Sequence, residues 1–246
     1  MLRERFERFT RSKCEVPEDS LGKIEEAYGR LFKYFGERTG GRSHGEWVVD
    51  EWPLFTTNYD AVLEHFWIDF ARVPLNTGFV YDSVAASRIS RPDAFHNQGL
   101  RLFKLHGSIT WLNDPIHGLT EQSIIPRDMR KATGSRFLGQ VMLYPIEEKE
   151  LYFEPYLTMF QQLNRELAST QMWVVIGYSF ADRFIREIFI HNSSKGTRMV
   201  LLHPSAKDVA ARLSGFKGRL EIVESKFGEG DLMVAPQMLW NAVAHA

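Results

Sequence analysis

The chain has 246 residues, of which 44% are hydrophobic and 25% charged, and its 30 basic residues almost balance its 31 acidic ones. This composition is typical of a globular protein, supplies the core of one large α/β domain, and gives no charge excess that favours nucleic acid or an anionic membrane as a partner. One cysteine, Cys14, leaves no internal disulfide and no cysteine-rich zinc site, so we expect no bound metal and a reducing compartment.

The N-terminal segment, residues 1–45, is expected to be largely helical. Apolar residues recur at near-helical spacing from Leu21 to Phe35, and Ser20 is suited to cap this helix. The start of the chain is charged and lacks the apolar stretch of a signal peptide, and no apolar run reaches membrane-spanning length. We therefore expect a cytoplasmic protein without a membrane partner.

Short apolar strands then alternate with helices. Strands are predicted at residues 52–57, 101–106, 173–176, 199–202 and 220–223. Helices are predicted at residues 62–70, 154–168 and 231–244, and around Ile185 to Phe189. Because strands that alternate with helices form parallel sheets covered on both faces, the sequence predicts an α/β fold, with residues 1–246 in a single domain.

Two stretches interrupt this alternation. Residues 72–100 are polar and contain several prolines and glycines, so they are expected to be irregular. Residues 111–142 are interpreted as a small loop-rich insertion or lid, because helix- and strand-breaking residues recur there: Pro115, Gly118, Pro126, Gly134 and Gly139.

The strand-to-loop junctions are the candidate sites, because ligands of parallel α/β sheets bind outside the carboxyl ends of the strands. Asn58 and Asp60 follow the first predicted strand. Their side chains are suited to cap the next helix, and also to hold a sugar hydroxyl, a water molecule or a carboxamide. His106 follows the second strand, where a histidine is either structural or a general base at neutral pH.

A third junction carries Gly177 and Ser179 between a strand and a helix. A glycine at this place lets the backbone approach a ligand, and helix N-termini bind phosphates. The alternative is an ordinary tight turn in which Asp182 caps the helix. The sequence contains no P-loop, no His-Glu-x-x-His motif and no Gly-x-Ser-x-Gly motif, which argues against P-loop nucleotidases, metalloproteases and α/β-hydrolases.

Three motifs in order carry a family resemblance: Phe55-Thr-Thr-Asn-Tyr-Asp60, Lys104-Leu-His-Gly-Ser108 and Gly177-Tyr-Ser-Phe-Ala-Asp182. Each lies at a predicted strand end, and together they resemble the motif series of the sirtuin-like family, in its bacterial NAD-hydrolase branch. The resemblance spans residues 52–204. It implies a Rossmann-like parallel sheet with an inserted small module, and hydrolysis of NAD to nicotinamide and ADP-ribose in antiphage defence.

The resemblance also implies roles for the residues at the first two junctions. Asn58 matches the asparagine that orders the nicotinamide ribose and a water molecule, and Asp60 matches the aspartate that holds the nicotinamide carboxamide. His106 matches the histidine that acts on the ribose hydroxyls as a base or positioning group. Breaking the nicotinamide–ribose bond passes through an oxocarbenium-like state, so the site must orient the ribose and hold the leaving group.

The remaining implied contacts concern the rest of the nucleotide. Thr57 is expected to contribute to NAD binding beside Asn58. Gly177 and Ser179 match the loop that lies against the phosphates and the adenosine ribose, and His203 is expected on the adenosine side. NAD or a related nucleotide is thus the implied substrate, and the implied protein partners are a second copy of the chain or a component of a defence system.

Two departures from the family pattern keep alternatives open. One cysteine leaves no four-cysteine zinc module, which favours hydrolysis of NAD over protein deacylation. Nothing before Trp52 matches the strand and Gly-Ala-Gly-x-Ser-like loop with which the family pattern opens, so the chain is either a fragment or mis-started copy, or a degenerate member. The alternative to a hydrolase is an inactive module that binds an NAD derivative or a partner protein, and an NAD-dependent deacylase is the third hypothesis.

Overall fold

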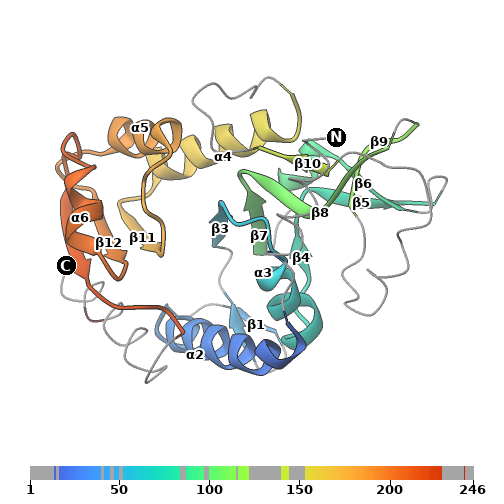
Figure 1. The fold of residues 1–246 in the computed structure, drawn as a ribbon, viewed down its shortest axis with the longest axis horizontal. Coiled ribbons are helices and arrows are strands. Elements are labelled where there is room, and N and C mark those ends of the chain that lie inside the picture. Colours follow the sequence, from blue (N-terminus) through green and yellow to red (C-terminus); the bar gives the residue numbers. More distant parts are fainter. Residues whose placement is uncertain are drawn as a thin grey trace. The chain divides into compact units, whose positions relative to one another are not determined.

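The computed structural model describes residues 14, 17–39, 42–44, 47–49, 52–83, 87–96, 100–114, 116–121, 140–143, 153–228 and 241. The chain divides into two compact units (Figure 1). The first unit comprises residues 1–21 and 50–159, and the second comprises residues 22–49 and 160–246. Each unit contains its own parallel sheet.

The parallel sheet of the first unit has the strand order β3-β7-β4. Its strands are β3 (Pro53–Thr56), β7 (Leu100–Lys104) and β4 (Leu75–Asn76). β3 and β7 pair so that Phe55 lies opposite Phe103, and the two rings stack with their centroids 4.8 Å apart. The Phe95 ring also stacks on the Phe103 ring, with the two centroids 4.6 Å apart. Aromatic packing therefore supports the pairing of β3 with β7.

Between β3 and β4 the chain forms α3 (Val62–Glu64), which continues as the π-helix η2 (His65–Phe70). Phe66 and Trp67 of η2 are buried, as the apolar pattern predicts. The other short helices of this unit are the 3-10 helices η1 (Glu18–Ser20) and η3 (Pro92–His96).

A second, antiparallel sheet of the first unit corrects two predictions. Its order is β10-β8-β9-β6-β5, with bounds β10 (Gln140–Met142), β8 (Gly107–Asp114), β9 (Gly118–Glu121), β6 (Ser87–Ser90) and β5 (Phe79–Asp82). The expectation that residues 111–142 are loop-rich is therefore wrong for 111–114, 118–121 and 140–142, and the irregular stretch expected at 72–100 contains strands. The interpretation of the segment as a lid stays a prediction, and residues 122–139 lie outside the described residues.

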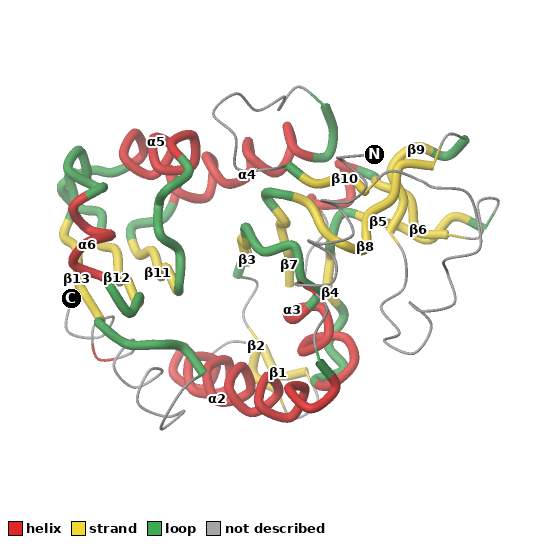
Figure 2. The backbone as a smooth tube through the Cα atoms, in the orientation of Figure 1, coloured by secondary structure: helices red, strands yellow, loops and turns green. Residues whose placement is uncertain are grey.

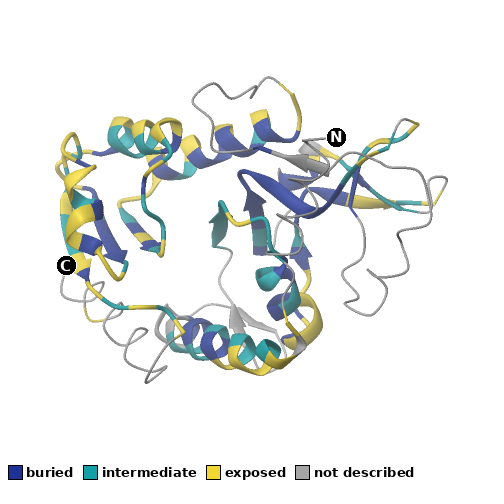
Figure 3. Cartoon of the chain, in the orientation of Figure 1, coloured by how far each residue is buried: buried dark blue, intermediate teal, exposed yellow. Residues whose placement is uncertain are grey.

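The physical reason for the error is that Gly118 belongs to a hairpin turn. The Asp114 carboxylate accepts hydrogen bonds from the amides of Ile116, at 2.8 Å, and His117, at 3.1 Å, and these amides hold its pKa below the ordinary value. Gly118 has φ 75°, a conformation suited to glycine. The strands around the turn bury polar residues, including Thr110 and Glu121, which hides the alternation that identifies a strand. Figure 3 shows β8 as a buried strand.

The second unit contains the parallel sheet β11-β12-β13. Its strands are β11 (Met172–Ile176), β12 (Arg198–Leu202) and β13 (Arg219–Val223), all close to their predicted bounds. Helix α5 (Arg183–Asn192) connects β11 to β12, and α6 (Ala206–Ala211) connects β12 to β13 (Figure 2). These strand-helix-strand connections and the parallel pairing confirm the predicted α/β, Rossmann-like fold class.

Two longer helices complete the described fold. α4 (Tyr156–Ser169) precedes β11, and Tyr156, Met159 and Leu163 on one of its faces are buried. α2 (Leu21–Thr39) belongs to the second unit, where the ring of Tyr28 meets that of Phe227 at 5.1 Å. In the described parts of the chain, no helix is both long and apolar enough to cross a membrane.

The predictions for the two ends of the chain have different outcomes. The N-terminal helix is confirmed for Leu21–Thr39, but β1 (Arg42–His44) forms an antiparallel pair with β2 (Trp47–Val49), so the expected helical segment 1–45 ends earlier. Residues 1–13 and most of the predicted helix 231–244 lie outside the described residues. The single domain over residues 1–246 stays a prediction.

The central strand β12 is expected to dominate the stability of the second unit. Leu201 is fully buried, whereas Ile222, its register partner on β13, is 41% exposed. We expect Leu201→Ala to lower the free energy of unfolding by about 2–5 kcal/mol, because it leaves a cavity. The matched variant Ile222→Ala is expected to cost about 1 kcal/mol. Urea unfolding of both variants measures the difference, and equal losses would contradict this account of the sheet.

Candidate functional site

The loop after β3 carries the first candidate residues. The Asn58 amide donates to Thr56 Oγ1 at 3.1 Å, and Asn58 itself is exposed, whereas Thr57 and Asp60 are half-buried. The Asp60 carboxylate accepts a hydrogen bond from the Val62 amide at 3.1 Å, at the start of α3. Asp60 therefore satisfies a free amide of the helix start through one oxygen, and its carboxylate keeps further acceptor capacity.

His106 lies in the turn between β7 and β8 and is 6% exposed. Its carbonyl accepts a hydrogen bond from the Leu143 amide at 2.8 Å, and its ring centroid is 6.3 Å from that of Tyr59. Gly107, which follows, has φ 88°, so the turn needs a residue that tolerates the left-handed region. His106 is thus a buried histidine beside the Asn58–Asp60 loop.

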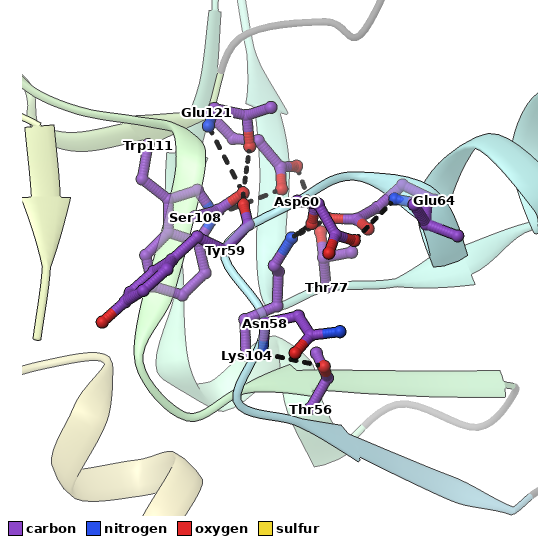
Figure 4. A network of polar contacts seen from close by, with 12 residues as sticks. Thr56, Asn58, Tyr59, Asp60, Glu64, Thr77, Lys104, Ser108, Trp111 and Glu121 are labelled. Carbon is purple, nitrogen blue, oxygen red and sulfur yellow. Dashed lines mark hydrogen bonds and ion pairs between the residues drawn. The ribbon is translucent and has the colours of Figure 1, made fainter. Parts of the chain in front are cut away.

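Hydrogen bonds join the two junctions, and in one of them, between residues drawn in Figure 4, Ser108 Oγ donates to the Tyr59 carbonyl at 3.4 Å. The Leu105 amide donates to the Thr56 carbonyl at 2.8 Å, and the Ile109 amide donates to the Tyr59 carbonyl at 3.0 Å. The Tyr59 hydroxyl donates to the Leu143 carbonyl at 2.5 Å. The structure therefore brings the Asn58–Asp60 loop next to His106, which follows Asp60 by 46 residues in the sequence.

A buried ion pair beneath this loop was missed by the sequence reasoning. Lys104 Nζ lies 2.7 Å from Glu64 Oε1, and the two side chains are 1% and 2% exposed. The Lys104 ammonium also donates to the Asp60 carbonyl. A signal was present in the sequence, because a lysine within an apolar strand needs a buried partner.

A second buried carboxylate, Glu121, lies near the first. It accepts hydrogen bonds from Arg88, from Thr77 Oγ1 at 3.1 Å and from Trp111 Nε1 at 3.4 Å. Burial raises the pKa of Glu121 above its ordinary value; the Arg88 guanidinium opposes this shift, and the charge of Glu64 adds to it. The Glu64, Lys104 and Glu121 side chains are therefore buried in the first unit, whereas the Arg88 side chain is 33% exposed.

The third junction lies in the second unit, after β11. Gly177 has φ 69° and is exposed, and among the described residues no heavy atom lies within 4 Å of the position that a Cβ would occupy. Arg212 donates to the Ser179 carbonyl at 2.9 Å, and Arg186 donates to the Phe180 carbonyl at 3.0 Å. Two guanidinium groups thus hold this loop through its backbone, and open space remains beside the glycine.

Asp182 and His203 have defined local roles in the same unit. The Asp182 carboxylate accepts hydrogen bonds from the amides of Phe184, at 3.0 Å, and Ile185, at 3.4 Å, which confirms the predicted helix cap. His203 follows β12, is half-buried, and its Nδ1 accepts a hydrogen bond from the Ser205 amide at 3.0 Å. A neutral His203 therefore carries its proton on Nε2.

The predicted site residues fall into two groups by unit. Thr57, Asn58, Asp60 and His106 belong to the first unit, and the residues that the resemblance assigns to the rest of the nucleotide belong to the second: Gly177, Ser179 and His203. Their assignment to NAD stays a prediction. Among the residues that the structure describes, no group of three or more histidine, cysteine, aspartate or glutamate side chains is arranged to hold a metal ion.

Comparison with known proteins identifies one family. The model of the SIR2-like domain matches residues 53–217, which is more than half of the chain and contains the Asn58, His106 and Gly177 junctions. A search of curated proteins finds no match.

The buried carboxylate of Glu121 gives a pH prediction. Because its pKa is raised in the folded state, its stabilising contribution is fully present below the unfolded pKa and is lost as pH rises through the folded pKa. We expect the wild type to lose stability relative to Glu121→Gln, which cannot ionise, as pH rises from the ordinary glutamate pKa of about 4.3 through the raised pKa of the folded state. Denaturant unfolding of both proteins across this range measures the difference, and a pH-independent difference would contradict the raised pKa.

The Asp182 cap gives a second prediction. Asp182→Ala removes the acceptor for two amides at the start of α5, so we expect the free energy of unfolding to fall by about 0.5–2 kcal/mol. Asparagine also accepts from these amides, so Asp182→Asn is expected to retain most of the stability. Urea unfolding compares the variants, and equal losses would show that the carboxylate does not act as a cap.

Proposed function

The chain belongs to the SIR2-like domain family, and from this premise we propose that it hydrolyses NAD to nicotinamide and ADP-ribose. Family membership supports an NAD-related activity. The observation that carries the specific proposal is the juxtaposition of the Asn58–Asp60 loop with His106 at the carboxyl ends of β3 and β7. This is the edge at which parallel α/β sheets bind their ligands.

The residue types at this edge suit cleavage of the nicotinamide–ribose bond. The reaction develops oxocarbenium character, so it needs a held leaving group and an oriented ribose rather than a strong nucleophile. One Asp60 oxygen accepts the Val62 amide, and the carboxylate retains acceptor sites for a carboxamide N–H₂. The exposed Asn58 amide is suited to a ribose hydroxyl or the attacking water, and His106 to the ribose hydroxyls as a base or positioning group.

By the resemblance, we propose nucleotide contacts for Thr57 in the first unit and, taken separately, for Gly177, Ser179 and His203 in the second unit. The open space beside Gly177 accommodates a close approach of a phosphate to the backbone. Ser179 offers a hydroxyl and His203 an Nε2–H donor, because its Nδ1 is engaged with the Ser205 amide. These residues fit a nucleotide in their chemistry, since each offers a small polar group or an accessible backbone.

Water, rather than an acyl-lysine, is the proposed acceptor. The sequence has one cysteine, so it offers no four-cysteine zinc module of the kind that deacylases of the family carry. We propose that depletion of NAD serves bacterial antiphage defence in the cytoplasm, as the resemblance of the three motifs implies. Assembly with a second copy or a defence partner stays a prediction.

The test is NAD turnover by the purified chain, measured as release of nicotinamide and ADP-ribose by chromatography. We expect His106→Ala to lower kcat by about 10²–10⁴-fold, the range of a lost acid–base group, and Asn58→Ala to lower turnover as well. His191→Ala and Asn113→Ala change the same residue types at exposed positions on α5 and β8, so they are the matched controls and should keep wild-type rates.

Each outcome separates the hypotheses. Loss of turnover in the two site variants alone supports the hydrolase. A wild type that is stabilised by NAD without turnover overturns the hydrolase in favour of a binding module, and release of acyl groups from a lysine peptide favours a deacylase. Equal losses in the controls would contradict the assignment of Asn58 and His106.

A further inference from the structure

Lys104 occupies the last position of β7, two residues before His106, and its side chain is buried at 1% exposure. Its ammonium bridges two elements that precede it in the chain by at least 40 residues. One contact is the backbone carbonyl of Asp60, in the loop after β3, and the other is the carboxylate of Glu64, in α3. The lysine thus connects β7, the loop and the helix at one point (Figure 4).

We infer that Lys104, neutralised by Glu64, is a positioning residue that holds the Asn58–Asp60 loop in the conformation that binds the nicotinamide end of NAD. This inference rests on the proposed function. Lys104 contacts the Asp60 peptide rather than the groups assigned to NAD, so it acts through the loop. Its buried ammonium contacts the backbone of the loop, whereas Asn58 is exposed.

The choice of partners supports positioning over simple stabilisation. A buried ion pair is weak support for stability, because an apolar pair of similar volume is often as stable or more so. An apolar pair, however, cannot donate a hydrogen bond to the Asp60 carbonyl. Charge-assisted hydrogen bonds are short and strong, so this contact determines the orientation of the loop peptide.

The neighbouring charges are consistent with this role. The buried Glu121 pairs with the partly exposed Arg88, so the Lys104–Glu64 pair is not required to neutralise either of them. At neighbouring positions of the loop, the Ile109 amide donates to the Tyr59 carbonyl, and the Val62 amide donates to the Asp60 carboxylate. Lys104 supplies the hydrogen bond to the Asp60 carbonyl, which lies in the chain between the Tyr59 carbonyl and the Val62 amide.

The test separates positioning from stability with two variants. Lys104→Met leaves Glu64 buried and unpaired, so its thermal midpoint is expected to fall. The double variant Lys104→Met/Glu64→Leu removes both charges and is expected to recover the midpoint. If Lys104 positions the loop, the double variant still shows amide hydrogen exchange about tenfold faster at Asn58 and Val62, and kcat for NAD about a hundredfold lower with a smaller change in KM.

Two further variants complete the design. Glu64→Gln keeps an acceptor for Lys104 and leaves its bond to the Asp60 carbonyl, so it should retain wild-type exchange in the loop even where the double variant fails to recover. Lys207→Met is the matched control, since it breaks an exposed pair with Glu224 at 2.8 Å and should change neither exchange in the loop nor kcat.

The outcomes distinguish this inference from the proposed function. A double variant with a recovered midpoint, wild-type exchange at Asn58 and Val62, and wild-type kcat overturns the positioning role. Fast loop exchange in Glu64→Gln overturns the idea that the carbonyl contact is the decisive one. If the wild type does not turn over NAD, the proposed function fails, and hydrogen exchange in the unliganded protein still decides whether Lys104 holds the loop.

Discussion

The parallel register of β3 with β7 is the constraint on which the candidate site depends. Thr56 lies opposite Lys104, so both strands end at the same level, and the Leu105 amide continues the pairing by donating to the Thr56 carbonyl. Asn58 and His106 each follow their strand end by two residues. Parallel pairing therefore converts a large separation in sequence into neighbouring loops, because the carboxyl ends of parallel strands meet at one edge of the sheet.

The first unit buries charged side chains near this edge, and taking them out of water costs desolvation free energy. Removing one partner of a buried pair typically costs about 3–5 kcal/mol, whereas replacing both with apolar residues is often neutral. The Lys104–Glu64 pair thus adds little net stability but makes the arrangement intolerant of partial change. Lys104 also contacts the loop that carries the proposed site, through the Asp60 carbonyl.

The loop after β11 is also held through its backbone carbonyls, by two arginine side chains instead of a lysine. Phe180 has φ 52°, a left-handed conformation that costs about 1–2 kcal/mol in a residue other than glycine. The complete burial of its ring and the Arg186 bond to its carbonyl offset that cost. A loop that is already fixed loses less conformational entropy when a ligand binds to it.

The sequence by itself determined the α/β class, the parallel strands and the helix cap at Asp182, because hydrophobic periodicity and capping act over a few residues. It also located the junctions at Asn58, His106 and Gly177. Only the tertiary structure decided that residues 107–114 and 118–121 pair as antiparallel strands, whose buried polar residues conceal the strand pattern, and that Lys104 reaches Glu64 and the Asp60 carbonyl. Those contacts join residues at least 40 positions apart, and local sequence patterns carry no information on which distant side chain neutralises a buried charge.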